Sequence, residues 1–492
     1  MIIKIGVVHM EKQKNELEFG MWKIGKSDFE LKGILHLSYE SNQFYLELYS
    51  DVNISLPHYT DVVYGKTHKG KEFTLYDCSI RGGTSISYAH DYKSKYIFKV
   101  HCSYILEGKV FTSDEEIKLK SVNFHLTNFN KWAFQQSIVE VETNDSDGYV
   151  IRTKKLEDFI HNNDEFQLSI SYVTIPDNEN KITTTFNIET FTKITMKFKN
   201  PTSLERAHSL IYQFRDFISL CTNLRTYIKY ISAVPYFTEE RGLDYPIQIY
   251  GQVIEFEKKE KISELTKFDE FISLDQIKDN FNICMSNWFQ KNEKLKPVID
   301  LYFSTKYHKT SNERHFLNLV QALEAYHRLT KENKVLPYDE HKTKIENILS
   351  NVPPEHKDWL KSRLAFSNEP NLHDRLDELL TPKSKSESPY YAARYQNLFI
   401  LHGKSKLELI RDIKNTRNYN THFDERLITK ALKGEELYQL IALLKSMMEY
   451  YLLMELEIDE DLVLDFIWKK VKDIHLRNEL IGYYEKNNIK FF

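Results

Sequence analysis

The chain has 492 residues, of which 41% are hydrophobic and 28% charged, with only 15 glycines and 12 prolines. This length exceeds what one hydrophobic core supports, and it predicts two or more domains of an ordinary ordered globular protein. The formal net charge of -4 excludes a protein that coats itself in nucleic acid through a domain-wide basic excess, so any nucleic-acid contact should be local.

Cysteine usage and apolar segments bear on the cellular compartment. Cys78, Cys102, Cys221 and Cys284 show no CxxC spacing, which argues against a structural zinc site and against a dense disulfide framework. Residues 1–16 lack a long apolar core, and no stretch reaches the roughly 18 uncharged apolar residues of a membrane span. We therefore expect a cytoplasmic protein with reduced thiols and no membrane partner.

The first half of the sequence alternates apolar and polar residues with the period of β-strands. Residues 29–50 alternate on either side of Ser41-Asn42 and predict a β-hairpin. Further strands are predicted at residues 96–106, 116–126, 136–142, 165–175, 181–189 and 192–199. Because no helical crossover separates these strands, we expect antiparallel pairing in a sandwich or a distorted barrel.

One amphipathic helix is expected within this β-rich half, at residues 204–222, with an apolar stripe that should pack on the sheet. A strand at 247–256 restores the period of two before a charged run. We therefore place the domain boundary between about residues 257 and 270, and assign residues 1–265 to an N-terminal domain and 266–492 to a C-terminal domain.

The C-terminal half shows helical periodicity from about residue 275 to the end. A helical segment at 280–305 should break or kink at Pro297. Residues 312–330 carry a clean apolar face, and residues 434–458 form a long helix whose Lys445 and Glu449 lie opposite its apolar stripe. This pattern predicts a helical bundle, and the fold class is α+β with separate β-rich and all-α domains.

A polar cluster follows the apolar stripe of the helix predicted at residues 408–423. The stripe runs from Leu409 toward Arg417, and a guanidinium on the buried side of a helix is costly unless it is paired or faces a site. The residues that follow it are Asn418, Tyr419, Asn420, Thr421 and His422. As a bare string, this spacing carries little information and is more typical of an arginine that reaches solvent and a histidine at a frayed helix end than of a functional site.

Three segments together resemble the HEPN domain of the ApeA type: residues 316–328 (FLNLVQALEAYHR), 364–379 (LAFSNEPNLHDRLDEL) and 417–422 (RNYNTH). In that family a β-rich N-terminal domain precedes the HEPN domain, and the proteins serve in bacterial abortive defence against phage. The resemblance covers the whole chain, with the HEPN core at about residues 308–458. It implies a metal-independent endoribonuclease that needs no cofactor and cuts RNA, with tRNA among the candidate substrates.

The residue types suit that chemistry. Metal-free RNA cleavage uses the ribose 2′-hydroxyl as nucleophile, and histidine, with an ordinary pKa of about 6.5, can take or give the protons. A planar guanidinium can stabilise the phosphorane with two parallel hydrogen bonds. The resemblance thus implies His422 as general acid or base, Arg417 as phosphate stabiliser and Asn418 as a residue that orients Arg417 or contacts phosphate. Support is expected from Glu324, as an ion-pair partner of Arg417, and from Tyr419 and Asn420.

Helix geometry adds a constraint on the pair. Five residues of an ideal helix rotate by about 140°, so Arg417 and His422 share no face if the helix continues undisturbed. Asn418, Asn420 and Thr421 are indifferent helix formers, and we expect the helix to loosen or end among them. One histidine cannot readily serve as acid and base in the same step, so we expect a homodimer whose active site is composite.

Other features and two alternative functions remain open. His308 and His315 lack partners at zinc-like spacing, and Arg81-Gly82-Gly83 is interpreted as a β-turn. Residues 383–395 interleave basic residues with tyrosines, which suits either single-strand binding or a solvated loop.

The N-terminal domain should sense an infection signal, such as a phage-derived activator, or hold the nuclease idle. The alternatives are a non-catalytic dimerisation or binding scaffold, and a nucleotidyl-transfer enzyme that uses the same Arg417 and His422.

Overall fold

The computed structural model describes residues 16–27, 29–38, 43–88, 91–144, 148–176, 188–236, 245–251, 265–266, 270–382, 389, 398–401 and 403–486. The chain forms two compact units. The first comprises Met1–Ser219, Leu224–Lys267 and Ser273–Lys278, and the second comprises Leu220–Asn223, Phe268–Ile272 and Asp279–Phe492.

Six strands of the first unit close into an antiparallel barrel. Their order is β6-β3-β2-β1-β4-β5, and β5 pairs again with β6. The strands are β1 (Glu16–Ile24), β2 (Leu31–Ser38), β3 (Gln43–Ser50), β4 (Tyr59–Thr67), β5 (Glu72–Tyr88) and β6 (Asp91–Glu107). This closure leaves the six strands with no free edge, and it confirms the expected antiparallel β-rich fold class.

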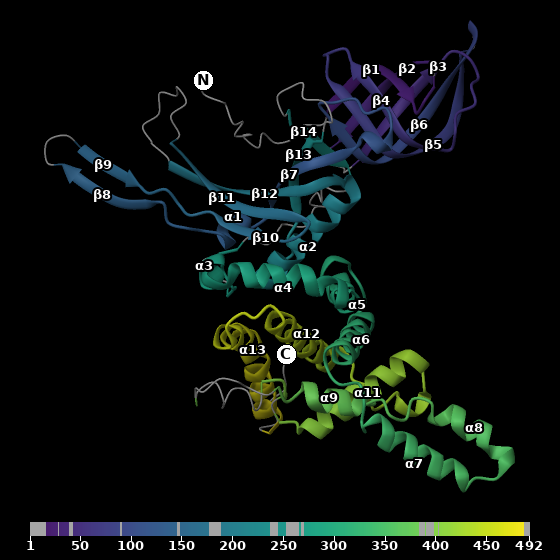
Figure 1. The fold of residues 1–492 in the computed structure, drawn as a ribbon, viewed down its shortest axis with the longest axis vertical. Helices are drawn as coiled ribbons and strands as arrows, with labels where there is room; N and C mark the ends of the chain where they lie inside the picture. Colours follow the sequence, from purple (N-terminus) through teal and green to yellow (C-terminus); the bar gives the residue numbers. More distant parts are fainter. Residues whose placement is uncertain are drawn as a thin grey trace. The chain divides into compact units, whose positions relative to one another are not determined.

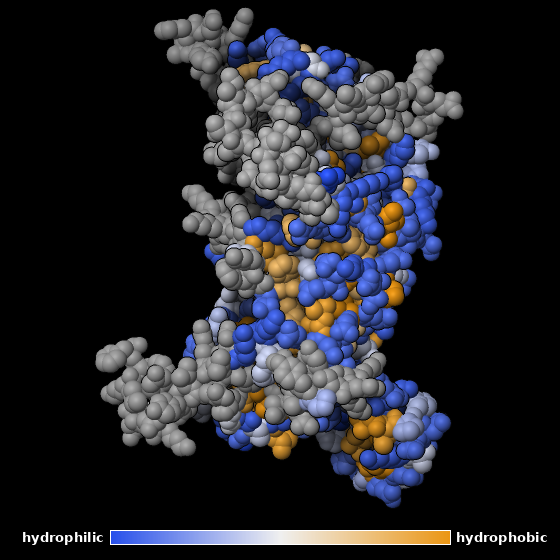
Figure 2. All heavy atoms as spheres, turned by 90° about the vertical axis from the view of Figure 1, so that its left-hand side faces the viewer, coloured by the Kyte–Doolittle hydropathy of each residue, from blue (hydrophilic) through white to orange (hydrophobic). Residues whose placement is uncertain are grey.

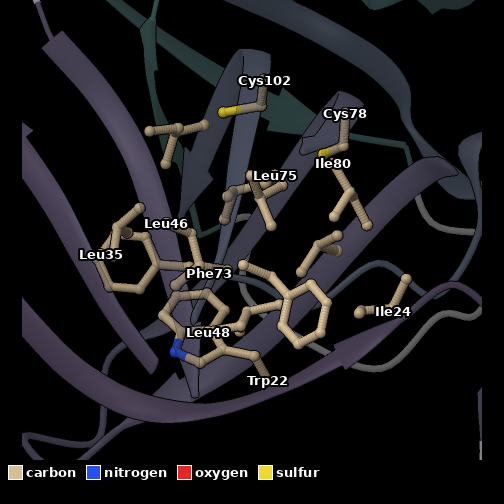
Figure 3. Close-up of a cluster of buried hydrophobic side chains, with 14 of the residues drawn as sticks. Trp22, Ile24, Leu35, Leu46, Leu48, Phe73, Leu75, Cys78, Ile80 and Cys102 are labelled. Carbon is tan, nitrogen blue, oxygen red and sulfur yellow. The ribbon is translucent and has the colours of Figure 1, made fainter. Parts of the chain in front are cut away.

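The barrel interior is filled by alternate side chains of these strands (Figure 3). Trp22 is fully buried and lies beside Phe73, with ring centroids 6.3 Å apart. Two glycines make room for its indole, because a Cβ added at Gly33 or at Gly65 would approach atoms of the Trp22 ring to 2.8 Å. Small residues are therefore required on the two strands that flank β1.

The remaining strands extend from β6 in the order β14, β13, β7, β12, β11 and β10. Their bounds are β7 (Lys118–Leu126), β10 (Phe159–Asn162), β11 (Phe166–Pro176), β12 (Ile188–Ser203), β13 (Ile228–Pro235) and β14 (Ile247–Gly251). A separate hairpin of β8 (Ile138–Asn144) and β9 (Gly148–Thr153) projects from this unit in Figure 1. The short helices of the unit are η1 (Asp114–Glu116), α1 (Phe129–Trp132) and α3 (Leu274–Ile277).

Helix α2 (Leu204–Thr222) packs on the sheet, as its apolar stripe predicts. Phe214 meets Phe124 of β7 edge to face, with ring centroids 5.9 Å apart, and Phe217 meets Trp132 of α1 in the same geometry. Aromatic pairs of this kind add to the free energy gained from apolar burial. The bounds of α2 match the prediction from the sequence.

The sequence predicted several strands correctly, left others unpredicted, among them β1, β4, β5 and β13, and misjudged two further segments. Residues 81–83 lie inside β5, where the register with β6 shifts between Arg81 and Thr84, so they form an irregularity within a strand and not a β-turn. Residues 192–199 fall within β12, which begins at Ile188 without the predicted break. Residues 181–187 and 252–256 lie outside the described residues.

The second unit is helical throughout its described parts, apart from its connecting loops. Its elements are η2 (Lys278–Asn280, shared with the unit boundary), α4 (Phe281–Lys294), α5 (Lys296–Tyr307), α6 (Asn312–Thr330), α7 (Tyr338–Ser350), α8 (Pro354–Leu364), α9 (Leu372–Leu379), α11 (Lys406–His422), η3 (Glu425–Leu427), α12 (Gly434–Met454) and α13 (Glu460–Lys486). Helix α6 packs against α5 and α12, and α12 also packs against α13 (Figure 1). The break before Pro297 is confirmed, since Leu295 separates α4 from α5.

Glu449 of α12 departs from the expectation that it lies on the polar face. Only 1% of this residue is exposed, and its carboxylate accepts hydrogen bonds from Tyr302 at 2.5 Å and from Lys470 at 2.6 Å. Burial alone would raise the pKa of Glu449, but Lys470, Lys445 and Lys306 lower it to about 2. Glu449 is therefore an ionised group inside the bundle, and α12 is buried on more than one side.

Helices α7 and α8 form a hairpin in which no residue is buried. Its base is held by Asn368, whose backbone and side chain form hydrogen bonds with Val335 and Leu336 at 2.8 to 3.0 Å. On the face drawn in Figure 2, hydrophilic side chains dominate, and hydrophobic ones emerge in patches between them. Among the described residues, no helix combines the length and the apolar character that crossing a membrane requires.

Candidate active site

Helix α11 carries the polar cluster that the sequence singled out. Its N-terminus is fixed by a capping box, in which the Ser405 side chain accepts from the Glu408 backbone and the Glu408 carboxylate accepts from Ser405. The buried stripe of the helix consists of Leu409, Ile410, Ile413 and Thr416. This stripe anchors α11 in the bundle and leaves the last turn at the surface.

Thr416, and not Arg417, ends the buried stripe. The Thr416 side chain is fully buried, and its hydroxyl oxygen accepts a hydrogen bond from the backbone N–H of Leu432 at 3.0 Å. Arg417 is half-buried and stands one helical turn after Ile413, so it continues the buried side of the helix toward the surface. The Thr416 bond joins α11 to the segment that leads into α12.

The helix runs without a break through the whole motif. It ends at His422, and Phe423 adopts a left-handed conformation, with φ of 52°, while its N–H donates to the Tyr419 carbonyl at 2.7 Å. The Thr421 hydroxyl donates to the Arg417 carbonyl at 2.7 Å, which is compatible with a continuing helix. The prediction that the helix loosens or ends among Asn418, Asn420 and Thr421 is therefore wrong, because the helix ends only at His422. The Arg417 and His422 side chains leave the helix axis in directions about 140° apart.

The conformation of the Arg417 side chain reduces the angle between its guanidinium and the face of the helix that carries His422. Its Nη1 donates a hydrogen bond to Oδ1 of Asn418 at 3.2 Å. Asn418 precedes His422 by four residues, so these two side chains lie on one face of the helix, one turn apart. The guanidinium is thus turned toward the face that carries the imidazole.

The surroundings of His422 are open and polar. His422 is exposed in the last turn, and the nearby Asp424 carboxylate is held below its ordinary pKa first by hydrogen bonds from Arg426 and, more weakly, by His422. The Lys433 ammonium lies 5.4 Å from the centre of the Tyr419 ring. This end of the helix therefore presents the His422 imidazole to solvent, together with the cations Arg426 and Lys433.

Of the expected supporting residues, Asn420 and Tyr419 are half-buried on α11, and Glu324 is half-buried on α6. Among the described residues, no ion pair joins Glu324 to Arg417, contrary to the expected pairing. The Glu324 carboxylate instead acts on Arg375 of α9, whose pKa is lowered by burial and by Arg328, and raised in part by Glu369 and Glu324. Glu324 therefore belongs to a different group of charges.

That group contains two buried polar residues that the analysis of the sequence did not single out. His327 and Arg375 are 1% and 3% exposed, and Arg375 Nη1 lies 3.1 Å from His327 Nδ1. Because a guanidinium can only donate, His327 Nδ1 accepts, and its Nε2–H donates to Glu378 at 2.9 Å. Arg375 also donates to Asn333 at 2.6 Å. The network joins α9 to α6. In the sequence, its histidine and its arginine stand in the segments AYHR (325–328) and HDRL (373–376).

The other segments that the sequence offered as metal-binding or RNA-binding candidates have less support. In the part of the chain that the structure describes, no group of three or more His, Cys, Asp or Glu residues could hold a metal ion. His308 is exposed at the end of α5, and His315 is half-buried near Lys445. Residues 383–395 lie outside the described residues, apart from Pro389.

Comparison with protein families gives two matches along the chain. The model of the ApeA N-terminal domain 1 matches residues 18–288, more than half of the chain, and the model of the Apea-like HEPN domain matches residues 317–462. The chain belongs to the ApeA-type HEPN family. The HEPN match includes the motif on α11 and the network between α6 and α9 of this ApeA-type protein. HEPN domains are in general nucleases, and membership of the family supports a role in defence.

Neither curated proteins nor solved structures gave a match to the chain. For this ApeA-type HEPN protein, the roles of individual residues therefore rest on the geometry of α11 and on chemistry. The strongest element of that geometry is the contact between Arg417 and Asn418, because it couples the cation to the face of the histidine.

Proposed function

We propose that the protein is a metal-independent endoribonuclease that acts in abortive-infection defence against phage. His422 transfers protons during attack of the ribose 2′-hydroxyl on the adjacent phosphate, and Arg417 stabilises the charge that develops on the phosphate oxygens. The products are a 2′,3′-cyclic phosphate and a free 5′-hydroxyl. The proposal is supported by family membership and by the exposed helix end that carries both groups.

The single observation that carries the proposal is the hydrogen bond from Arg417 to Asn418. A guanidinium that reaches solvent freely has no preferred direction, whereas this bond aims it at the side of α11 where His422 stands. Asn418 then acts as a positioning residue, because it holds the cation while the imidazole stays exposed to RNA. Correct orientation of this kind can account for a large share of a rate enhancement.

A single copy supplies one exposed imidazole, whereas the reaction needs a base for the 2′-hydroxyl and an acid for the leaving 5′-oxygen. We propose that two chains pair through their HEPN domains, so that two copies of Arg417 and His422 face one phosphodiester. The N-terminal domain then serves to sense a phage-derived signal or to hold the nuclease idle.

The decisive experiment compares RNA ends. Total RNA is incubated with the purified protein and EDTA, and in parallel RNA is taken from phage-infected cells that express it, so that an idle state is also covered. We expect 2′,3′-cyclic phosphate ends with the wild type and with His308→Ala, an exposed histidine outside the motif, but not with His422→Ala. Equal ends from wild type and His422→Ala would count against the nuclease, and a requirement for ATP and Mg²⁺ would favour nucleotidyl transfer.

A mixing experiment tests the composite site. Wild-type chains are titrated with His422→Ala chains under conditions that allow subunit exchange. If both copies contribute to one site, mixed dimers are impaired and activity falls more steeply than the fraction of wild-type chains. Activity that simply follows that fraction would contradict a shared site while leaving the nuclease itself in place.

A further inference from the structure

A cavity of about 420 Å³ lies in the first unit, between strands β5 and β6 and helix α2, far along the sequence from the HEPN motif. Its lining comprises Tyr76, Asp77, Ser103, Tyr104, Glu205, His208 and Tyr212. All these residues belong to the same compact unit and to well-defined elements. The catalytic proposal makes no use of any of them.

The cavity exists because the alternation of both strands slips at the same level. In β5, core residues Leu75 and Cys78 are separated by two residues where strict alternation would place one, and in β6 the same holds between Cys102 and Ile105. Tyr76 pairs with Tyr104 and Cys78 pairs with Cys102, so the two slips face each other. Two pairs of adjacent positions, 76–77 on β5 and 103–104 on β6, are therefore left out of the barrel core and line the cavity beside α2.

The slip has a conformational cost at Asp77. This residue has φ of 57°, a left-handed conformation that costs a non-glycine residue about 1 kcal/mol or more. The side chain is held in place, because its carboxylate accepts hydrogen bonds from Tyr59 at 2.9 Å and from Ser103. Strain of this kind persists only where the surrounding structure holds the residue in place, as Tyr59 and Ser103 do here.

The charge of the cavity lining is negative. Burial alone would raise the pKa of Glu205, but hydrogen bonds from Tyr76, from the backbone and from Ser203 lower it, so Glu205 is ionised at neutral pH. Asp77 adds a second carboxylate, and the lining contains no lysine or arginine. Outside the lining, Lys118 acts on Glu205 and Arg215 acts on His208, and the Arg215 guanidinium bonds to Asp216 at 2.7 and 3.0 Å. Two carboxylates that share a cavity favour a cation between them.

The rest of the lining is aromatic, and one of its rings already carries a cation, because the Arg215 guanidinium lies 4.1 Å from the centre of the Tyr212 ring. The His208 ring lies 4.2 Å from the Tyr212 ring and 5.7 Å from the Tyr104 ring, centroid to centroid. Its Nδ1 is 2.8 Å from the Tyr104 hydroxyl, while its Nε2 is shielded from solvent and finds no hydrogen-bond partner among the described residues. Burial, assisted by Arg215, lowers the pKa of His208 to about 4, so the imidazole is neutral near pH 7.

We propose that this cavity binds a ligand through a positively charged, N–H-rich group, either a guanidinium or a primary ammonium. Asp77 and Glu205 supply the counter-charges, each with acceptor sites beyond the bonds already made. The rings of Tyr76 and Tyr104 line the same cavity and supply the aromatic surface for a cation–π contact. The group belongs either to a free small molecule or to a basic side chain of a protein.

The test is titration calorimetry on the full chain with three probes: agmatine, a blocked Gly-Arg-Gly peptide and the same peptide with neutral citrulline in place of arginine. We expect saturable binding of agmatine or of the arginine peptide, and none of the citrulline peptide. Stronger binding of agmatine indicates a free metabolite as the source, and stronger binding of the peptide indicates a protein side chain.

Variants locate the binding. Glu205→Gln and Asp77→Asn should each weaken it about tenfold or more, the expected loss for a charged hydrogen bond, and asparagine tolerates the left-handed backbone at position 77. Glu157→Gln, an exposed carboxylate outside the cavity, should bind like the wild type. Thermal unfolding without ligand confirms that each variant is folded. Equal binding of both peptides, unchanged binding in both cavity variants, or no saturable binding at millimolar concentrations overturns the proposal, whatever the outcome of the RNA experiments.

Discussion

Nη1 of Arg417 donates to Oδ1 of Asn418 at 3.2 Å, and Asn418 stands one helical turn before His422 on the same face of α11. The adjacent side chain thereby offsets part of the angle that an unbroken helix imposes between the arginine and the histidine. In the proposed active site, Asn418 therefore has a geometric role in addition to its own chemistry.

Replacing Asn418 with alanine should lower RNA cleavage about tenfold to hundredfold, because the guanidinium loses its direction. The bond is partly buried and joins neighbouring residues of one helix, so the unfolding temperature should change little. Asn347→Ala, on the exposed side of α7, provides a matched control that should retain wild-type activity. Full activity of the Asn418 variant would show that Arg417 needs no such guidance.

Arg417→Lys should lose nearly as much activity as Arg417→Ala, on the order of a hundredfold, because an ammonium cannot make the two parallel hydrogen bonds of a guanidinium. Cleavage rates on one defined RNA would measure this. Arg411→Lys, on the exposed side of the same helix, controls for a general loss of positive charge. A lysine variant as active as the wild type would reduce Arg417 to a point charge.

Thr416→Val should destabilise the protein by about 1 to 3 kcal/mol, since the buried N–H of Leu432 loses its acceptor at nearly constant side-chain volume. Thr416→Ser keeps the hydroxyl and should lose less. Thermal unfolding of the full chain would compare the three proteins. A valine variant with an unchanged unfolding temperature would show that the bond between α11 and the segment before α12 contributes little.

Acid should destabilise the bundle through Glu449. Its pKa is about 2 in the folded protein against an ordinary value of 4.5, so the unfolded chain binds the proton first as the pH falls. The free energy of unfolding should therefore decrease between pH 4.5 and about 2, by up to roughly 3 kcal/mol.

The matching variant is Glu449→Gln, which should remove this part of the pH dependence and lower stability at neutral pH, since Lys470 loses its counter-charge. Glu293→Gln, an exposed carboxylate on α4, should keep the acid sensitivity of the wild type. Parallel acid profiles for the wild type and the Glu449 variant would assign the sensitivity to other groups.

Regular periodicity made much of the fold predictable. Helices α2 and α6 match their predicted bounds, because each has one clean apolar stripe and, for α6, a serine cap at Ser311. The hairpin of β2 and β3 was also visible in strict alternation. The order of strands that closes the barrel is a long-range property, and no local pattern encodes it.

The errors have local physical causes. Strand β5 escaped prediction because its alternation slips at Tyr76 and again near Arg81, so it lacks a uniform period of two. Glu449 was taken for a surface residue, since a charge in a helix usually marks the solvent side; only its three lysine neighbours reveal otherwise. In the candidate site, the helix and its polar cluster were predictable from the sequence, but the continuity of the helix through His422 was not. The role of Thr416 was not predictable either, because its hydrogen bond depends on Leu432, sixteen residues away.

The hairpin of α7 and α8 has no fully buried residue, and its base is held by the hydrogen bonds of Asn368 and by one between His341 and Ser367. Its amide hydrogens should exchange with deuterium well before those of α12, and proteases should cut there first. Inserted peptides or fluorescent labels should also be tolerated well at its tip. A label at this position could report conformational changes of the HEPN domain without disturbing its core.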